Sequence, residues 1–216
     1  MVQLQRPEPH IFSFRPSPRS EICLVRVSQI DDSYESELKE VDRERYASIS
    51  HPQKRKEFLA SRVALNRLCS DLQLTYERRR PLLRWGGHLS LTHAHHWAGC
   101  YYSPAHRVGI DIEGDRPKLI QLAPKFLNPE EISFAFADED HLFRLQILWG
   151  AKEALFKLWG QRGVSFKENI SIGKFKVRRA GSANAFIHFH DQLVRCEVHF
   201  RLIEDAFVVW ALEIDD

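Results

Sequence analysis

The sequence has few cysteines and no long apolar run. Its four cysteines, Cys23, Cys69, Cys100 and Cys196, form no Cys-x-x-Cys pair, which argues against a zinc ribbon or a disulfide framework. No apolar run is long enough to span a membrane, and no apolar segment follows the first charges as it would in a signal peptide. We therefore expect buried thiols in a cytoplasmic protein without a membrane partner.

The net charge is also small. The 31 Lys and Arg residues nearly balance the 29 Asp and Glu residues, for a net charge of +2, which argues against a general nucleic-acid coat. The basic residues nevertheless gather in the first half, in HPQKRKEFLASR (51–62) and YERRRPLLR (76–84). This uneven placement predicts a local site for an anionic ligand.

The 216 residues are enough for one large domain or two compact halves. The proline-rich start up to Pro18 suggests an extended arm or an edge segment. Apolar spacing predicts a helix over 51–72, with strands before it at 21–29 and after it at 88–103 and 106–114. Each half thus reads as helix first and sheet second, with a join near residue 105.

The second half repeats this order. Asn128 followed by Pro129 predicts a helix start, and a longer helix is predicted over 141–160. Strands of an antiparallel meander are then predicted at 170–179, 185–191, 193–203 and 206–214. The expected fold class is α+β, in two halves, 1–105 and 106–216, each with an antiparallel sheet and helices.

The stretch RVGIDIEG (107–114) lies at the join. Its side chains alternate as in a strand, so Asp111 and Glu113 share one face while the apolar residues share the other. Two carboxylates so close repel each other unless a cation lies between them. Gly109 is on their face, where it would leave room either for a ligand or for a turn.

A third carboxylate follows in LWGAKEALFK (148–157). Glu153 and Lys157 are four residues apart on the predicted helix and share a face, which is also the spacing of an ordinary surface pair. Beside Asp111 and Glu113, however, Glu153 would complete an oxygen site suited to Mg²⁺.

These motifs, in this order, resemble the 4′-phosphopantetheinyl transferase superfamily. VGIDIE and LWGAKEALFK are similar to its paired signature, LSLTHAHHW (89–97) to its Ser-x-Ser-His segment, and RRPLL (79–83) to its Gly-Lys-Pro segment. The length and the mid-chain join resemble the monomeric, surfactin-synthetase-activating type, with two pseudo-symmetric halves. One departure is Gly150, which stands where the family usually has serine and costs a helix about 1 kcal/mol relative to alanine.

The resemblance implies a reaction and its residues. The family moves the phosphopantetheine arm of coenzyme A to a serine of an apo acyl or peptidyl carrier protein and releases adenosine 3′,5′-bisphosphate, as a holo-[acyl-carrier-protein] synthase does. Asp111, Glu113 and Glu153 would hold Mg²⁺, Glu153 would also be the base, and Lys157 would lie against the phosphates.

The resemblance also implies where coenzyme A binds. The basic first half would bind its nucleotide, with His93 on the 3′-phosphate and Thr92 in the preceding hydroxyl position. Arg80 stands in place of the family's phosphate-binding lysine, which is chemically sound because a guanidinium grips phosphate in bidentate fashion. The basic-helix positions Lys54 and Arg62 would face the phosphates too.

Three other readings stay open. His93 and His95 would share a strand face, as a pair of zinc ligands does, but no cysteine or second histidine pair has zinc-finger spacing. A coenzyme A or nucleotide-binding module of the same fold would not transfer. A two-metal phosphohydrolase would need a second acidic cluster, which the sequence lacks.

Overall fold

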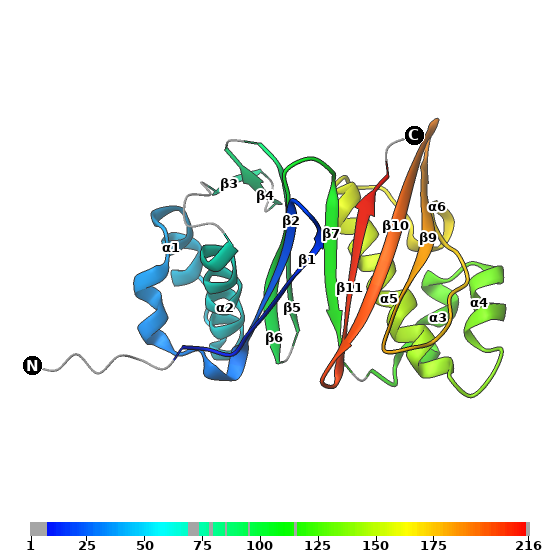
Figure 1. Ribbon diagram of the computed structural model, residues 1–216, viewed down its shortest axis with the longest axis horizontal. Coiled ribbons are helices and arrows are strands. Elements are labelled where there is room, and N and C mark those ends of the chain that lie inside the picture. The colour runs from blue at the N-terminus through cyan, green and yellow to red at the C-terminus, as the bar shows by residue number, and fades with distance from the viewer. Residues whose placement is uncertain are drawn as a thin grey trace, which may run out of the picture.

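Two antiparallel sheets pack face to face, and helices cover the outer face of each (Figure 1). This is seen in a computed structural model, which describes residues 8–68, 74–77, 80–84, 86–94, 96–114 and 116–214, without the side chains of Glu77 and Arg80. The architecture is the predicted α+β class, with helices of the first half on one side and helices of the second half on the other.

The first sheet has the strand order β1-β2-β6-β5. Its strands are β1 (Ile11–Ser17), β2 (Ser20–Arg26), β5 (His88–Ala94) and β6 (Trp97–Ser103). Between β2 and β5 the chain forms two 3₁₀ turns, two helices and a small hairpin: η1 (Val27–Gln29), η2 (Asp32–Glu37), α1 (Glu40–Ala47), α2 (Pro52–Leu68), β3 (Leu74–Glu77) and β4 (Arg80–Leu83). The proline-rich start is therefore an edge strand from residue 11.

The second sheet has the order β7-β11-β10-β9-β8. Its strands are β7 (Val108–Glu113), β8 (Ile170–Ile172), β9 (Ala180–Phe189), β10 (Gln192–Ile203) and β11 (Ala206–Glu213). The helices are α3 (Leu119–Phe126), α4 (Pro129–Ala135), α5 (His141–Trp159) and α6 (Phe166–Asn169). The connection from β6 to β7 carries the chain from one sheet to the other.

Three apolar clusters hold these layers together. One lies between α2 and the first sheet, and one lies between α5 and the second sheet. The third, which we call the inter-sheet core, joins the two sheets and includes Ile22, Trp97, Ile110, Val208 and Trp210. The two halves are therefore packed into one body.

Most predicted elements are present, with two corrections and one helix end that lies outside the described residues. The first half begins with two strands, not with a helix, and α1 was not predicted. The strand predicted at 170–179 ends at Ile172, and the described residues after it pair with β9 only through the bond from Gly173 N to Asn184 O. The helix predicted to Leu72 is seen to Leu68, and residues 69–73 lie outside the described part.

Two predictions of local structure are confirmed. Asn128 caps α4 in a capping box with Glu131, and Pro129 follows in the first turn. Cys23, Cys100 and Cys196 are buried free thiols, whereas Cys69 lies outside the described residues. In the part of the chain that the structure describes, no helix is both long and apolar enough to cross a membrane.

Candidate active site at the seam of the two halves

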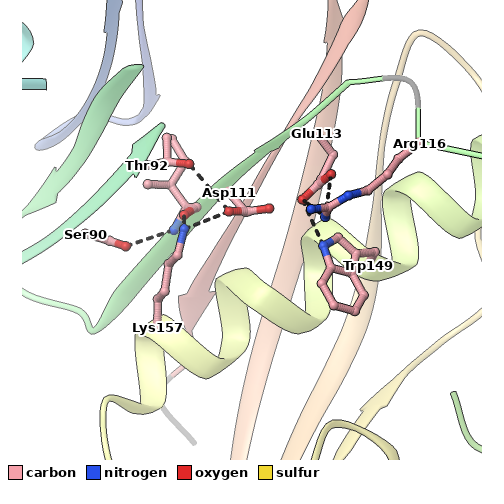
Figure 2. Close-up of polar contacts among 8 residues, drawn as sticks. Ser90, Thr92, Asp111, Glu113, Arg116, Trp149 and Lys157 are labelled. Atoms are coloured by element: carbon pink, nitrogen blue, oxygen red, sulfur yellow. Dashed lines mark hydrogen bonds and ion pairs between the residues drawn. The ribbon is translucent and has the colours of Figure 1, made fainter. Parts of the chain in front are cut away.

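Strand β7 presents its two carboxylates to helix α5, as the alternation predicts. Val108, Ile110 and Ile112 point into the inter-sheet core, and Asp111 and Glu113 lie on the opposite face, above α5 (Figure 2). Asp111 is 8% exposed. Asp111 is thus buried and the Glu113 side chain is 12% exposed, so the pair is not a solvated strand face.

Two glycines set how closely α5 approaches the second sheet. A Cβ on Gly109 would lie 1.8 Å from the backbone oxygen of Ala154, and a Cβ on Gly150 would lie 2.8 Å from a methyl group of Val209. Gly109 is therefore required neither by a ligand nor by a turn, but by the helix that carries Glu153 and Lys157. Gly150 serves the same contact from the helix side, which explains why glycine stands there.

Asp111 is held from both halves of the chain. The Lys157 ammonium donates hydrogen bonds to Asp111 Oδ1 at 2.7 Å and to the Ile110 carbonyl at 2.8 Å. From the first half, the Thr92 hydroxyl donates to the same Oδ1 at 3.5 Å, and Ser90 Oγ accepts from Ile110 N at 3.1 Å (Figure 2). The carboxylate therefore sits where β5 meets β7.

Glu113 has its own partners. Trp149 Nε1 donates to Glu113 Oε1 at 2.8 Å, and Arg116 Nη1 lies 3.3 Å from the same oxygen. Burial, followed by the charge of Asp111, nevertheless raises the pKa of Glu113 to about 8. Burial and the nearby Asp111 therefore disfavour the charged form of Glu113, which a bound cation would favour.

Glu153 shares this environment. It lies one helical turn before Lys157 near the end of α5. Burial raises the pKa of Glu153 above its ordinary value, and the charge of Asp111 adds to the increase, whereas Lys157 and Arg116 oppose it. A carboxylate with a raised pKa is better matched to accepting a proton near neutral pH.

The donor set suits a divalent cation. Asp111 Oδ2 is buried and has no hydrogen-bond partner among the described residues. A cation there would satisfy this oxygen and lower the repulsion with Glu113. Within the described residues, however, no three His, Cys, Asp or Glu side chains are grouped as a metal site. This is compatible with Mg²⁺, which often takes one or two protein carboxylates and completes its shell with water and phosphate.

Two of the residues predicted to bind the nucleotide meet on one carboxylate. Lys54 Nζ lies 2.7 Å from Glu57 Oε2, and His93 Nε2 lies 4.0 Å from the same oxygen. The side chains of Lys54 and His93 are 56% and 54% exposed, whereas that of Glu57 is 5% exposed. The structure thus forms an exposed basic pair over a buried acid, between α2 and β5.

The other residues predicted to bind the nucleotide do not join this exposed pair. Arg62 is 5% exposed, donates to Asp42 Oδ1 at 2.9 Å, and has its guanidinium 4.0 Å from the centre of the Phe58 ring, so it is part of the interior. Arg80 opens β4, but its side chain lies outside the described residues. Thr92 is buried and directs its hydroxyl to Asp111.

Sequence reasoning missed four residues of this region: Ser90, Glu57, Arg116 and Trp149. Ser90, Glu57 and Trp149 stand inside the motifs that were noticed. Ser90 and Trp149 bind residues of β7, however, and Glu57 lies near His93 of β5 as well as Lys54 of its own helix. Arg116 and Trp149 meet only because α5 packs under the end of β7, with the Arg116 guanidinium 5.6 Å from the Trp149 ring centre. The only signal in the sequence for any of these residues was the positive charge of Arg116, just after the acidic strand.

The zinc reading gains no support here. His93 lies beside Glu57. His95 lies outside the described residues, and the residues that the structure does describe contain no histidine or cysteine group that could hold a metal.

Fold and site together define an α+β protein with buried carboxylates and a lysine at the seam of two halves. Residues 107–211 match the family model of the 4′-phosphopantetheinyl transferase superfamily. The second half of the chain thus has the sequence pattern of that superfamily, and the match includes Asp111, Glu113, Glu153 and Lys157. It begins after the basic pair of Lys54 and His93.

Two solved structures are similar to part of the chain. The holo-[acyl-carrier-protein] synthase of Thermotoga maritima aligns with a TM-score of 0.42 and 18% identity, over 50% of this chain and 63% of that chain. This chain therefore spans less than two thirds of that protein. The holo-[acyl-carrier-protein] synthase of Neisseria meningitidis aligns with a TM-score of 0.38 and 22% identity, over 50% of this chain and 97% of that chain. No curated protein matches the chain.

Proposed function

We propose that the protein transfers the 4′-phosphopantetheine arm of coenzyme A to a serine of an apo acyl or peptidyl carrier protein and releases adenosine 3′,5′-bisphosphate. One observation carries the proposal: the stretch that matches the superfamily contains a buried Asp111 bonded to Lys157, with Glu153 one turn away on the same helix. We further propose a cytoplasmic monomer of the two-halved, surfactin-synthetase-activating type, because both sides of the seam come from one chain.

Glu153 is the proposed base. Its raised pKa suits a group that accepts the proton of the carrier serine as the hydroxyl oxygen attacks the phosphorus. Lys157 is proposed to lie against the phosphates and to offset charge on the leaving group. Its ammonium is already fixed by Asp111 and by the Ile110 carbonyl, so little ordering is needed when substrate arrives.

Asp111 and Glu113 are the residues proposed to hold Mg²⁺, whereas Glu153, the third predicted ligand, is not grouped with them among the described residues and is proposed as the base alone. When bound, this ion would neutralise the diphosphate and stabilise charge as the phosphoryl group moves. The buried, unpartnered Asp111 Oδ2 supports this assignment. The Thr92 hydroxyl donates a hydrogen bond to Asp111. We therefore assign Thr92 to positioning that carboxylate, in place of the predicted contact with coenzyme A.

For the nucleotide of coenzyme A we propose Lys54 and His93, which are exposed side by side, together with Arg80. Arg62 is left out because its guanidinium is buried on Asp42. Arg80→Ala should weaken binding of coenzyme A, as measured by titration calorimetry. Arg43→Ala, which removes an exposed cation on α1, is the matched control. Equal affinities in the two variants would remove Arg80 from the site.

The transfer is tested by incubating the protein with coenzyme A, Mg²⁺ and a panel of apo carrier proteins, and then weighing the carriers. Gain of one phosphopantetheine is expected with at least one carrier. It should be lost with Glu153→Gln and kept with Glu139→Gln, which alters an exposed acid before α5. Binding of coenzyme A without any mass gain would favour the binding-module alternative.

The acidic pair has its own test. Asp111→Asn keeps the shape of the side chain but removes the charge, so Mg²⁺-dependent transfer should fall by at least about 100-fold while the circular dichroism spectrum is unchanged. An Asp111→Asn protein with full activity would show that the acidic pair is structural.

A further inference from the structure

An open groove lies at the edge of the inter-sheet core that is remote from Asp111. In the first sheet, β5 is the edge strand beside Asp111, and β1 is the opposite edge. The groove has a volume of about 740 Å³ and lies between β1, the start of β9 and the end of β10, with Trp210 of β11 in its wall. It is therefore separate from the candidate active site.

The groove is lined by cations and by no acid. Three arginines reach it from different strands or their ends: Arg15, Arg179 and Arg201, and His199 lies between them on β10. We call these four residues and the hollow between them the arginine groove. No aspartate or glutamate is among its lining residues, so the hollow itself favours anions.

Acids outside the groove compensate only part of this charge. Glu21 lies 3.7 Å from Arg15, and Glu197 lies 3.2 Å from His199. Arg179 and Arg201 are exposed, and neither forms an ion pair with any residue in the described ranges. At least two guanidiniums are therefore available to a ligand.

Aromatic rings hold two of these groups, Arg201 and His199, in place. The Arg201 guanidinium lies 5.3 Å from the ring centre of Phe12 and 5.8 Å from that of Phe14, and the Phe14 ring contacts Trp210 at 5.1 Å. The His199 ring is stacked on Trp210 at 5.4 Å. Trp210 is 7% exposed, so these contacts rest on a ring that is itself fixed in the inter-sheet core.

We propose that the arginine groove binds an acidic, extended segment of a partner protein. Small-molecule sites enclose most of their ligand, whereas this hollow is open and its cations come from separate strands. Guanidiniums bind carboxylates in bidentate fashion, so spaced arginines suit a row of acidic side chains. Within the described part of the chain β1 is an edge strand, so its outer edge offers backbone groups that no neighbouring strand pairs with, except at Pro16, which has no N–H.

This inference does not depend on phosphopantetheinyl transfer. It is tested with the intact protein and a fluorescein-labelled ten-residue peptide of glutamate, aspartate and glycine, by fluorescence anisotropy at low salt. The double variant Arg179→Gln and Arg201→Gln should weaken binding about tenfold, equivalent to about 1.4 kcal/mol. The control Arg43→Gln removes one exposed cation on α1, as Arg179→Gln does in the groove, and should stay within twofold.

Arg201 packs on two rings, so its replacement alone could loosen β1. Arg179→Gln, which alters an exposed side chain that contacts no ring of the described residues, is therefore measured separately and should weaken binding about threefold. Unchanged affinity in Arg179→Gln and in the folded double variant would overturn the proposal. So would displacement of the labelled peptide by sodium triphosphate at a lower concentration than by unlabelled peptide, because the groove would then be a phosphate site.

Discussion

Replacing Gly109 by alanine tests how the candidate active site is assembled. The added Cβ would lie 1.8 Å from Ala154 O and 2.9 Å from Leu158 N, both backbone atoms of α5. Real Cβ atoms essentially never approach another atom within 3.0 Å, so α5 must retreat by about 1.2 Å (3.0 − 1.8). A helix backbone cannot rotate aside as a side chain can.

The retreat should affect stability and activity together. Overpacking of a core costs about 1–3 kcal/mol, and a backbone clash belongs at the upper end, so we expect a loss of about 3 kcal/mol. The same movement carries Lys157 and Glu153 away from Asp111. Because the Lys157–Asp111 contact is 2.7 Å, and a misplacement of about 1 Å can cost 100-fold in rate, transfer should fall by about that factor.

Urea unfolding followed by tryptophan fluorescence measures the first effect, and the carrier-mass assay measures the second. Gly114→Ala is the matched control, because a Cβ at Gly114, just beyond the same strand, has no atom within 4 Å. It should change stability by less than about 0.5 kcal/mol. If Gly109→Ala were as stable as Gly114→Ala, α5 would not pack on β7 as described.

Other predictions concern the rest of the molecule. Lys152→Met should cost about 3–5 kcal/mol in urea unfolding, because Lys152 is fully buried 2.7 Å from Glu131, and adding Glu131→Gln should recover part of the loss. The hydrogen bonds from Arg107 lower the pKa of Glu213, so this pair stabilises the fold above pH 4.5 and loses that effect as pH falls through the lowered pKa. Glu213→Gln should therefore cost about 1 kcal/mol at pH 7 and less at pH 3, a difference that equal losses at both pH values would contradict. Burial raises the pKa of Cys23 to about 12, so iodoacetamide at pH 8 should modify it only after unfolding, as peptide mass mapping can check.

Periodicity predicted the parts of the fold that depend on local pattern. The alternation in β7 gave the two faces correctly, and Asn128 with Pro129 gave the start of α4. Helix α1 was missed because its sequence, EVDRERYA, has almost no apolar residues, and only Asp42 and Tyr46 are buried. A helix held by the Asp42–Arg62 ion pair and the Tyr46 ring has no periodic pattern of apolar residues from which it could be predicted.

The site was predictable in its residue types but not in its contacts. Spacing singled out Asp111, Glu113, Glu153 and Lys157, which the structure brings to one strand and the helix beneath it. Arg62 was expected at a ligand, but its partner Asp42 comes from the unpredicted α1. The neighbouring residues in the sequence could not show why position 109 must be glycine. The atom that excludes a side chain there belongs to Ala154, on helix α5.

The inter-sheet core also determines whether the two halves would stay associated after a break in the chain between them. Its side chains come from both sheets, and Ile22, Ile110 and Val208 have no measurable exposure. If a protease cleaved the connection between Ser103 and Val108, each fragment alone would expose an apolar sheet face to water. The two pieces should therefore stay together as a noncovalent complex, and separately made halves should reassemble with Asp111 again next to Thr92.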